Sequence, residues 1–510
     1  MAPVPNQFAN ETTPVELVKL DENFAAFQSA SGSSLVGFNN GGSGATTRTA
    51  QVKMGDIVSV KDFGAVGDGI ADDTTAIQAA CVNPADVFFP AGVYLVNNLD
   101  IPSNTSLYRE KNNQSVIKRK NNGTGNVFIS VSNRSNVKFS NLTIDGNKAN
   151  QTNAAHNISF VGCEQVTVEH CLIKNAKAVS GGFGAGIAFS DGTNDTELKQ
   201  SRIAFNTIET CDGAGIYINK DSFISITDNL LKANEDGVLA INFVFPPVQY
   251  VQNYFTVTNN RCVNNEGVGI RFVGFYIGGT SSAPIQGPLA PPQKGVLISN
   301  NICKSNGQYG IAFQGFGATI AGNFVEENGT VSADGGILVN AWGSTITGNV
   351  VHNNAAYGID GGGSVRCLFN SNVISYQGLT SGLMATGLNI GGTVDCQAVG
   401  NILENNGGTG SAAIYLSGWE FGGGSYFDQL GARVLVANNQ IKLATSGAIG
   451  IYFNHGMDFA TLTGNQVVDA AAGNAFLLRG GFNNFQVSAN NNIDWSNGGF
   501  DFSQRKSTIK

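Results

Sequence analysis

The sequence predicts an all-β fold, a right-handed parallel β-helix, and three observations lead to that prediction. A short motif recurs from about residue 201 to residue 491, in which an apolar/polar alternation is followed by an Asn, a few polar residues, Gly-Ile and a second alternation. The closest copies are 22 to 26 residues apart, a period typical of solenoid proteins. The copies contain neither a helical pattern nor the regular Leu positions of leucine-rich repeats, which leaves short strands turning at Gly and Asn corners.

The repeated Asn is expected to form a corner of each coil. Asn tolerates the left-handed backbone conformation, and stacked Asn amides can hydrogen-bond from coil to coil as a ladder. The repeated Asn residues are Asn206, Asn229, Asn260, Asn301, Asn323, Asn349, Asn372, Asn401, Asn439, Asn465 and Asn490. The residues predicted to face inward and stack into an apolar column are Ile203, Phe205, Ile216, Ile226, Leu239, Val257, Ile270, Ile298 and Ile311.

Composition narrows the classes of function. The formal net charge is −8, which argues against a nucleic-acid partner because phosphate binding needs a basic surface. The eight Cys show no CxxC spacing and the four His are scattered, so buried free thiols are expected, and neither a metal site nor a cofactor. The N-terminal residues lack the pattern of a signal peptide, and no apolar run reaches the length of a membrane span. Synthesis in the cytoplasm without a signal peptide, and no membrane insertion, are therefore expected.

The first 56 residues differ from the rest. Residues 12–30 predict a helix with Thr13 as its cap and Pro14 at its first position, followed by a Gly/Ser/Thr-rich linker. Leu17, Leu20, Phe24 and Phe27 form an apolar stripe, which fits either packing within the chain or a short coiled coil between protomers.

Residues 57–100 predict a cap on the solenoid. Here SVKDFGA is expected to form a strand and VGDG a turn, and the Asp72-Asp73-Thr74-Thr75 segment is expected to cap an Ala-rich helix. Helix capping explains the cluster of Asp68, Asp72 and Asp73 better than a calcium site, because the spacing matches no known calcium loop. Such a helix would shield the apolar end of the first coil from water. The β-helix itself is expected over 101–495, with a C-terminal tail over 496–510.

The segment VSVKDFGAVGDGIADDTTAIQAA, followed by VFFPAGVYLV, resembles the opening of pectate-lyase-like β-helix proteins, especially bacteriophage tailspikes. The resemblance covers about residues 33–96 at the level of motifs. It implies a homotrimer on the virion that acts at the host cell surface, where it binds and usually cleaves a bacterial capsule or O-antigen. It also implies that residues 1–56 attach the protein to other tail or baseplate proteins.

Four insertions predict the working surface. They lie at 191–200, 242–255, 274–295 and 418–432, and each follows a Gly-Ile strand, so all are expected to wall the same lateral face. Exposed aromatic rings on them would stack against sugars, unless they bury the loops or a trimer interface. The predicted substrate-binding residues are Arg271, Tyr276, Tyr250, Trp419, Phe421 and Tyr426.

A column of carboxylates predicts the chemistry. Asp212, Glu235 and Glu266 occupy equivalent places before three successive Gly-Ile strands, with Asp236 beside them. Stacked strands repeat at about 4.8 Å, and carboxylates that close together oppose each other's ionisation, so one is expected to hold its proton. A proton-holding acid beside an ionised carboxylate suits glycoside hydrolysis, retaining or inverting according to their separation.

CDGAGI and NEDGVLAIN resemble two catalytic motifs of polygalacturonases, although the His and Arg-x-Lys motifs of that family have no counterpart here. That resemblance implies Glu235 as general acid and Asp212 or Asp236 as base. The alternatives are that these are solvated corner acids, or that the acids lie at Asp191, Asp195 and Glu197 or at Glu420 and Asp428.

Three other functions remain open from the sequence. β-Elimination of a uronic-acid polymer would need cations such as Arg261, Arg271 and Lys294. The others are a receptor-binding protein without catalysis and a secreted pectin enzyme.

Overall fold

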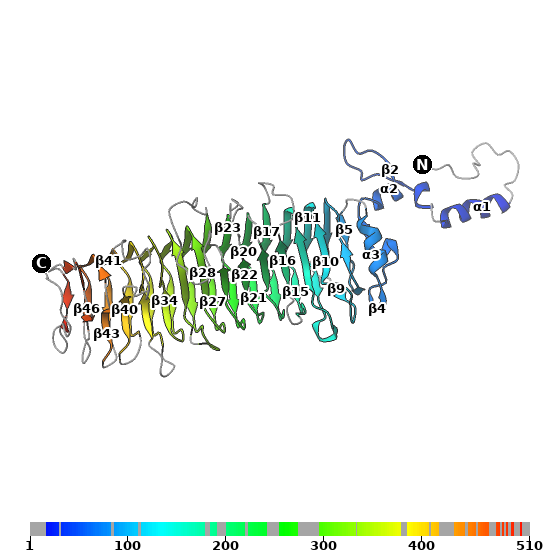
Figure 1. Cartoon of the computed structure of the whole chain (residues 1–510). Coiled ribbons are helices and arrows are strands. Elements are labelled where there is room, and N and C mark those ends of the chain that lie inside the picture. The colour runs from blue at the N-terminus through cyan, green and yellow to red at the C-terminus, as the bar shows by residue number, and fades with distance from the viewer. Residues whose placement is uncertain are drawn as a thin grey trace.

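The computed structural model describes residues 17–29, 32–82, 86–110, 114–178, 184–190, 200–219, 223–241, 254–273, 295–332, 334–378, 385–406, 410–417, 433–443, 447–454, 457–468, 476–479, 482–483, 486–487, 491–493 and 500–501. Over these residues the chain forms a long stack of coils (Figure 1). Each coil contributes one strand to each of three parallel sheets, as β20, β21 and β22 do in one turn of the chain. The predicted right-handed parallel β-helix is confirmed.

The three sheets are named here in the order used below. Sheet 1 has 15 described strands: β7 (Leu99–Asp100), β10 (Val127–Ser132), β13 (His156–Val161), β16 (Ile187–Ser190), β19 (Ile216–Asn219), β22 (Val238–Ile241), β25 (Ile270–Val273), β28 (Ile311–Phe316), β31 (Ile337–Trp342), β34 (Tyr357–Asp360), β37 (Thr386–Asn389), β40 (Ala412–Ser417), β43 (Ile449–Asn454), β47 (Phe476–Arg479) and β51 (Phe500–Asp501). The last of these falls within the segment predicted as a tail.

Sheet 2 has 16 described strands: β3 (Val58–Ser59), β5 (Asp86–Phe88), β8 (Thr105–Tyr108), β11 (Ser135–Ser140), β14 (Glu164–Glu169), β17 (Ser201–Ala204), β20 (Ile224–Thr227), β23 (Phe255–Thr258), β26 (Val296–Ser299), β29 (Ala318–Ala321), β32 (Thr345–Thr347), β35 (Leu368–Asn370), β38 (Cys396–Val399), β41 (Val434–Ala437), β45 (Ala460–Thr463) and β49 (Gln486–Val487).

Sheet 3 has 16 described strands: β4 (Asp68–Asp72), β6 (Gly92–Val96), β9 (Ser115–Arg119), β12 (Thr143–Asp145), β15 (Leu172–Lys174), β18 (Thr207–Glu209), β21 (Leu230–Lys232), β24 (Arg261–Val263), β27 (Ile302–Lys304), β30 (Phe324–Glu326), β33 (Val350–His352), β36 (Val373–Ser375), β39 (Ile402–Glu404), β42 (Gln440–Lys442), β46 (Gln466–Val468) and β50 (Asn492–Ile493).

The remaining elements are short helices and two small strand pairs. They are α1 (Leu17–Gln28), η1 (Gly32–Leu35), β1 (Gly37–Phe38), β2 (Arg48–Thr49), α2 (Ala50–Met54), η2 (Val60–Phe63), α3 (Thr74–Cys81), η3 (Lys148–Asn150), β44 (Met457–Asp458) and β48 (Phe482–Asn483). The predicted cap of α1 at Thr13 lies outside the described residues. None of the helices among the described residues is long and apolar enough to cross a membrane.

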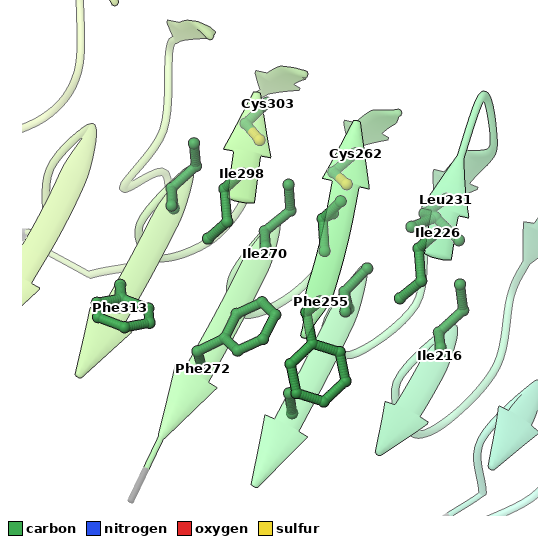
Figure 2. Close-up of a cluster of buried hydrophobic side chains, with 14 of the residues drawn as sticks. Ile216, Ile226, Leu231, Phe255, Cys262, Ile270, Phe272, Ile298, Cys303 and Phe313 are labelled. Atoms are coloured by element: carbon green, nitrogen blue, oxygen red, sulfur yellow. The ribbon is translucent and has the colours of Figure 1, made fainter. Parts of the chain in front are cut away.

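The core is a set of apolar columns, because residues in register on successive strands stack along the solenoid axis. Ile216, Val238 and Ile270 are in register in sheet 1 and fully buried. Figure 2 shows Phe255, Phe272 and Phe313 pointing into the same interior, with Cys262 and Cys303 on neighbouring strands. All eight Cys are buried and free, as predicted.

Two of the predicted inward positions are wrong. Phe205 is 46% exposed, because it occupies a left-handed corner (φ 57°) and its side chain leaves the core. Leu239 faces outward on β22, and Val238 takes the inward place between Ile216 and Ile270.

The repeated Asn residues form a buried ladder between sheets 2 and 3. Asn301, for example, donates its Nδ2 to Asn323 Oδ1 at 3.0 Å and accepts the backbone N–H of Asn260 at 2.9 Å. The left-handed residue is not this Asn but the one before it, such as Asn300 (φ 55°). The ladder ends at Asn491 rather than the predicted Asn490, which lies outside the described residues.

A second buried ladder, which the sequence analysis missed, runs between sheets 3 and 1. Its members are Asn234, Asn265, Asn306, Asn328, Asn354, Gln377 and Asn406. This ladder precedes the strands of sheet 1 and therefore fixes the corner that carries the predicted carboxylates.

The solenoid begins with α3, which lies at the N-terminal end of the stack (Figure 1). Ile77, Ala80 and Cys81 of this helix are buried in the core, in keeping with the predicted cap. The segment SVKDFGA is only briefly a strand and continues as η2. Asp73 does not cap α3 with its side chain; it is buried and accepts the backbone N–H groups of Val66 and Gly67, which hold the VGDG turn.

Candidate functional site

The four insertions leave the solenoid from one sheet. They follow β16, β22, β25 and β40, all strands of sheet 1. All four insertions therefore begin at the ends of strands of the same sheet; whether they wall its outer face stays a prediction. Most insertion residues, including Tyr250, Tyr276, Trp419, Phe421 and Tyr426, lie outside the described residues. So do the alternative carboxylates Asp191, Asp195, Glu197, Glu420 and Asp428.

The predicted carboxylates line the opposite border, where the strands of sheet 1 begin. Each of these acids comes directly after a residue at a position of the second ladder. The N–H of Cys211 donates to Asn234 Oδ1 and the N–H of Asn234 donates to Asn265 Oδ1, and the acids Asp212, Glu235 and Glu266 follow these three residues. The backbone of Glu235 hydrogen-bonds to the coils on both sides, to Gly213 O and from Gly267 N. The three acids thus occupy one corner of three successive coils.

The coil that carries Glu235 is one residue shorter than its neighbours at this corner. In this coil the ladder residue Asn234 and the inward residue Val238 are four positions apart. In the coils on either side the corresponding residues are five positions apart: Cys211 and Ile216, and Asn265 and Ile270. As a result Asp236 takes the place that Ala214 and Val268 hold in the adjacent coils. A carboxyl group therefore stands at an apolar position.

Asp212 lies between two lysines. Lys148 Nζ is 3.0 Å from its Oδ1 and Lys177 Nζ is 3.1 Å from its Oδ2, and the N–H of Ala178 also donates to Oδ2. Partial burial opposes ionisation of this carboxyl group, but the two lysines favour it more strongly, so the pKa of Asp212 is lowered. Asp212 is therefore held as a carboxylate.

Glu235 has the opposite environment. It is an exposed residue, yet partial desolvation and the negative charges of Asp236 and Glu266 raise its pKa, with Arg271 acting against them. Glu266 is likewise exposed.

Asp236 is 3% exposed. Burial raises its pKa, although the N–H of Val268 donates to its Oδ1 at 2.6 Å and Arg271 lies 3.7 Å from its Oδ2. Arg271 projects from β25 on the outer face of sheet 1, in register with Leu239 and Ala312.

The lysines and a histidine are the residues that sequence reasoning missed. Lys148 is 64 residues from Asp212 and Lys177 is 35 residues from it, and neither position belongs to the repeat motif. His156 stacks on Tyr217 with ring centroids 6.0 Å apart, and burial lowers its pKa to about 4. Because the N–H of Ala185 donates to Nδ1, the proton of the neutral ring is on Nε2.

The other predicted cations do not join the site. Arg261 faces outward on β24 of sheet 3, away from sheet 1, and Lys294 lies outside the described residues. Within the described part of the chain, no three His, Cys, Asp or Glu residues gather as they would around a metal ion.

Two family models match consecutive parts of the chain. Residues 57–278 match the model described as rhamnogalacturonase A/epimerase, pectate lyase-like. Residues 274–429 match the model described as right handed beta helix region.

Relatives of known name match parts of the chain. The tail spike protein of Escherichia virus K5 is 26% identical over 252 residues, which are 48% of this chain and 35% of that protein. Mannuronan C5-epimerase AlgE1 of Azotobacter vinelandii is 39% identical over 110 residues, 18% of this chain and 8% of that enzyme. The chain therefore spans about a third of the length of the first relative, and far less of the second.

Among solved structures, the N-terminal fragment of gene product 12 of bacteriophage phi29 superposes with a TM-score of 0.51. The two are 16% identical, and the superposition covers 84% of this chain and 70% of that fragment, which shows a shared fold. The resemblance of the opening motif is confirmed: residues 57–429 match the models of pectate-lyase-like and right-handed β-helix proteins, and a phage tail spike protein is among the relatives.

Proposed function

We propose that this chain is a phage tailspike that binds a bacterial surface polysaccharide on the outer face of sheet 1 and cleaves it by endo-glycosidic hydrolysis. In this proposal the protein resides in the virion tail and acts at the surface of the host cell. The similarity to the tail spike protein of Escherichia virus K5 supports that setting.

The observation that best supports hydrolysis is that two acids at one corner of neighbouring coils have different surroundings: Asp212 lies between two lysines, and Glu235 lies beside two other acids. The pKa of Glu235 is raised and that of Asp212 is lowered. Pairs of carboxyl groups whose environments drive their pKa values apart are the acid and base of glycoside hydrolysis. Glu235 therefore donates its proton to the glycosidic oxygen as the bond breaks, and Asp212 takes a proton from the water that attacks the anomeric carbon.

Asp236 and Glu266 have supporting roles in this proposal. Asp236 is too buried to meet a sugar, so we assign it to raising the pKa of Glu235 and to orienting Arg271. Glu266 adds negative charge beside Glu235 and is exposed to substrate.

The proposal is tested by digesting purified polysaccharides with matched variants. Capsules and O-chains from a panel of Escherichia strains would be incubated with the wild type, Glu235→Gln, Asp212→Asn and Asp236→Asn, and the new chain ends identified by mass spectrometry. Loss of the general acid is expected to lower kcat by about 10² to 10⁴. The control is Glu404→Gln, a surface glutamate paired with Lys442 on sheet 3. Full activity in both Glu235→Gln and Asp212→Asn would exclude these roles.

A second reaction, β-elimination, is favoured by the cations found at this corner. Elimination needs positive charge to neutralise the carboxylate of a uronic acid, and Lys148, Lys177 and Arg271 supply it beside Asp212 and Asp236. Asp212 is then the candidate base for the C5 proton. Products that absorb in the ultraviolet as unsaturated uronates would establish elimination; products that gain one water would establish hydrolysis.

The proposal includes a homotrimer and attachment to other tail proteins through the N-terminus. Leu17, Leu20, Phe24 and Phe27 of α1 are 77%, 37%, 63% and 47% exposed, an apolar stripe that a coiled coil would cover. Light scattering on the full chain and on the double variant Leu20→Ser/Phe24→Ser tests it. A wild type that remains monomeric at micromolar concentration would rule the trimer out.

A further inference from the structure

In the middle of sheet 1, two successive strands are followed by very short connections. Gly317 alone connects β28 to β29, and only Gly343 and Ser344 connect β31 to β32. The long insertions come after β25 on one side of this stretch and after β40 on the other. The outer face of β28, β31 and β34, called the strip below, therefore belongs to coils that lie between those carrying the long insertions.

The side chains on this strip include several polar and aromatic residues. On β31 the inward residues Ile337, Val339 and Ala341 are fully buried, so Leu338, Asn340 and Trp342 point outward. On β28, Gln314 and Phe316 stand in register with Asn340 and Trp342.

Trp342 is the most distinctive residue of the strip. It is half-buried and stacks on Phe316, with ring centroids 6.4 Å apart and planes inclined by 27°. The guanidinium carbon of Arg366 lies 5.5 Å from its ring centroid. Two neighbours therefore hold the indole in a fixed orientation.

Arg366 is itself accessible. Its side chain is 62% exposed and its Nε lies 3.7 Å from Asp395, whose carboxylate is already gripped by Arg433 through both oxygens. Arg366 therefore retains donor capacity beside the Trp342 ring.

The strip continues to a half-buried carboxyl group on β34. Asp360, in register with Leu338, accepts hydrogen bonds from Asn389 Nδ2 at 2.8 Å and from the N–H of Gly362 at 3.2 Å. Tyr309 also hydrogen-bonds to it. Asp360 thus lies on a strand and faces outward.

We propose that the outer face of β28, β31 and β34 is a glycan-binding platform, on which a pyranose ring stacks on Trp342 while Gln314, Asn340 and Arg366 hydrogen-bond its oxygens. A rigid half-buried indole surrounded by amide and guanidinium donors matches a sugar, which presents apolar C–H faces and a rim of hydroxyl groups. The platform rests on the proposed function, since it extends the binding of the same polysaccharide beyond the acids.

The position of the platform sets the length of glycan that uses it. Trp342 lies three strands beyond β22, about 14 Å along the axis, and at the opposite end of the strands from Glu235. A chain that touches both must cross the sheet diagonally and be several rings long. Short oligosaccharides bound at Glu235 do not reach Trp342.

The test compares long and short glycans on matched variants of the full chain. Trp342→Ala and Trp342→Phe would be placed in the Glu235→Gln background, and binding to the Escherichia capsules and O-chains measured by calorimetry. Loss of a buried aromatic anchor is expected to weaken binding by about 10-fold or more, with Trp342→Phe recovering part of it. The control is Phe324→Ala, an aromatic residue 39% exposed on sheet 3. Asn340→Ala serves as a second platform variant if Trp342→Ala does not fold.

The outcomes separate the platform from the proposed function. If the platform variants bind long glycans more weakly and short glycans normally, the platform is supported. This holds even if the wild type binds the glycan without cleaving it, a result that would exclude only the proposed hydrolysis. Cleavage by the wild type with unchanged affinity in the Trp342 and Asn340 variants overturns the platform alone. A wild type that neither binds nor cleaves any of these polysaccharides overturns both.

Discussion

The Asn ladder predicts a large and local loss of stability when one amide is removed. Asn301 is fully buried and makes two bonds to backbone groups: its Nδ2 donates to Val257 O at 2.8 Å, and its Oδ1 accepts the Asn260 N–H at 2.9 Å. Asn301→Ala leaves both backbone groups without that partner. The side chains of Asn260 and Asn323 keep other bonds, to Ile226 O and from Asn301 N respectively.

The expected cost follows from those two stranded groups. A buried backbone group left without a partner costs about 1–3 kcal/mol, so Asn301→Ala is expected to destabilise the coils around it by about 2–6 kcal/mol. A solenoid opens locally, because each coil contacts only its neighbours. Hydrogen exchange measured by mass spectrometry should therefore accelerate by about 30-fold to 10⁴-fold in peptides spanning residues 255–263 and 296–326.

Two comparisons make this prediction refutable. Asn340→Ala removes the same amide from the outer face of β31 and is expected to leave exchange in those peptides nearly unchanged. Peptides from the first coils, around residues 99–119, should also be unaffected. If hydrogen exchange around Asn301 accelerated by less than about 5-fold, the prediction would be wrong. The hydrogen bonds of the ladder amides would then stabilise the coil little more than the bonds that the same groups make to water when the coil opens.

Three further predictions concern the candidate site and the core. Lys148→Met or Lys177→Met removes a cation that lowers the pKa of Asp212, so the acidic limb of the pH profile of kcat/KM should move to higher pH. The alkaline limb, which the raised pKa of Glu235 sets, should stay in place, and an acidic limb that does not move would exclude Asp212 as the base. Gly267→Ala places a Cβ 2.4 Å from Asp236 Oδ1 and should lower kcat about 10-fold or more, whereas Gly55→Ala, whose nearest neighbour is a backbone oxygen at 3.3 Å, should be silent in the same assay. The buried thiols, such as Cys81 with its pKa raised to about 12 by burial, should resist a thiol reagent in the native protein, and all eight should react after denaturation; rapid native labelling would contradict the stacked core.

The fold was predictable because the repeat motif specifies each coil locally. An Asn after a polar residue, with β-branched residues at alternate positions, determines both the corner and the inward face of the next strand. The two wrong inward positions, Phe205 and Leu239, arose where alternation alone cannot tell which parity faces the core. At Phe205 the backbone enters the left-handed region, and at Leu239 the preceding corner has lost a residue, which shifts the parity by one.

The candidate site was predictable only in part, because its partners are brought together by stacking and not by sequence spacing. The column of Asp212, Glu235 and Glu266 could be read from equivalent places in the repeat. The lysines could not, since Lys148 belongs to the short helix η3 and Lys177 to the turn after β15, both outside the motif. The platform at Trp342 depends on which connections are short, and its meaning appears only when the strands are seen side by side.

The corner of the coil that carries Glu235, which is one residue shorter than its neighbours, affects both the inward pattern and the candidate site. The coil that lacks one residue between its ladder Asn and its inward residue still makes the backbone bonds of the ladder: Asn234 Oδ1 accepts the N–H of Cys211, and the Asn234 N–H donates to Asn265 Oδ1. The shorter corner does place Asp236 where the neighbouring coils have Ala214 and Val268, and so it buries a carboxyl group against Glu235. Asp236→Ala would remove negative charge beside Glu235 and should lower the alkaline limit of activity. It would also leave the buried N–H of Val268 without its 2.6 Å bond to Oδ1, so it should not stabilise the coil.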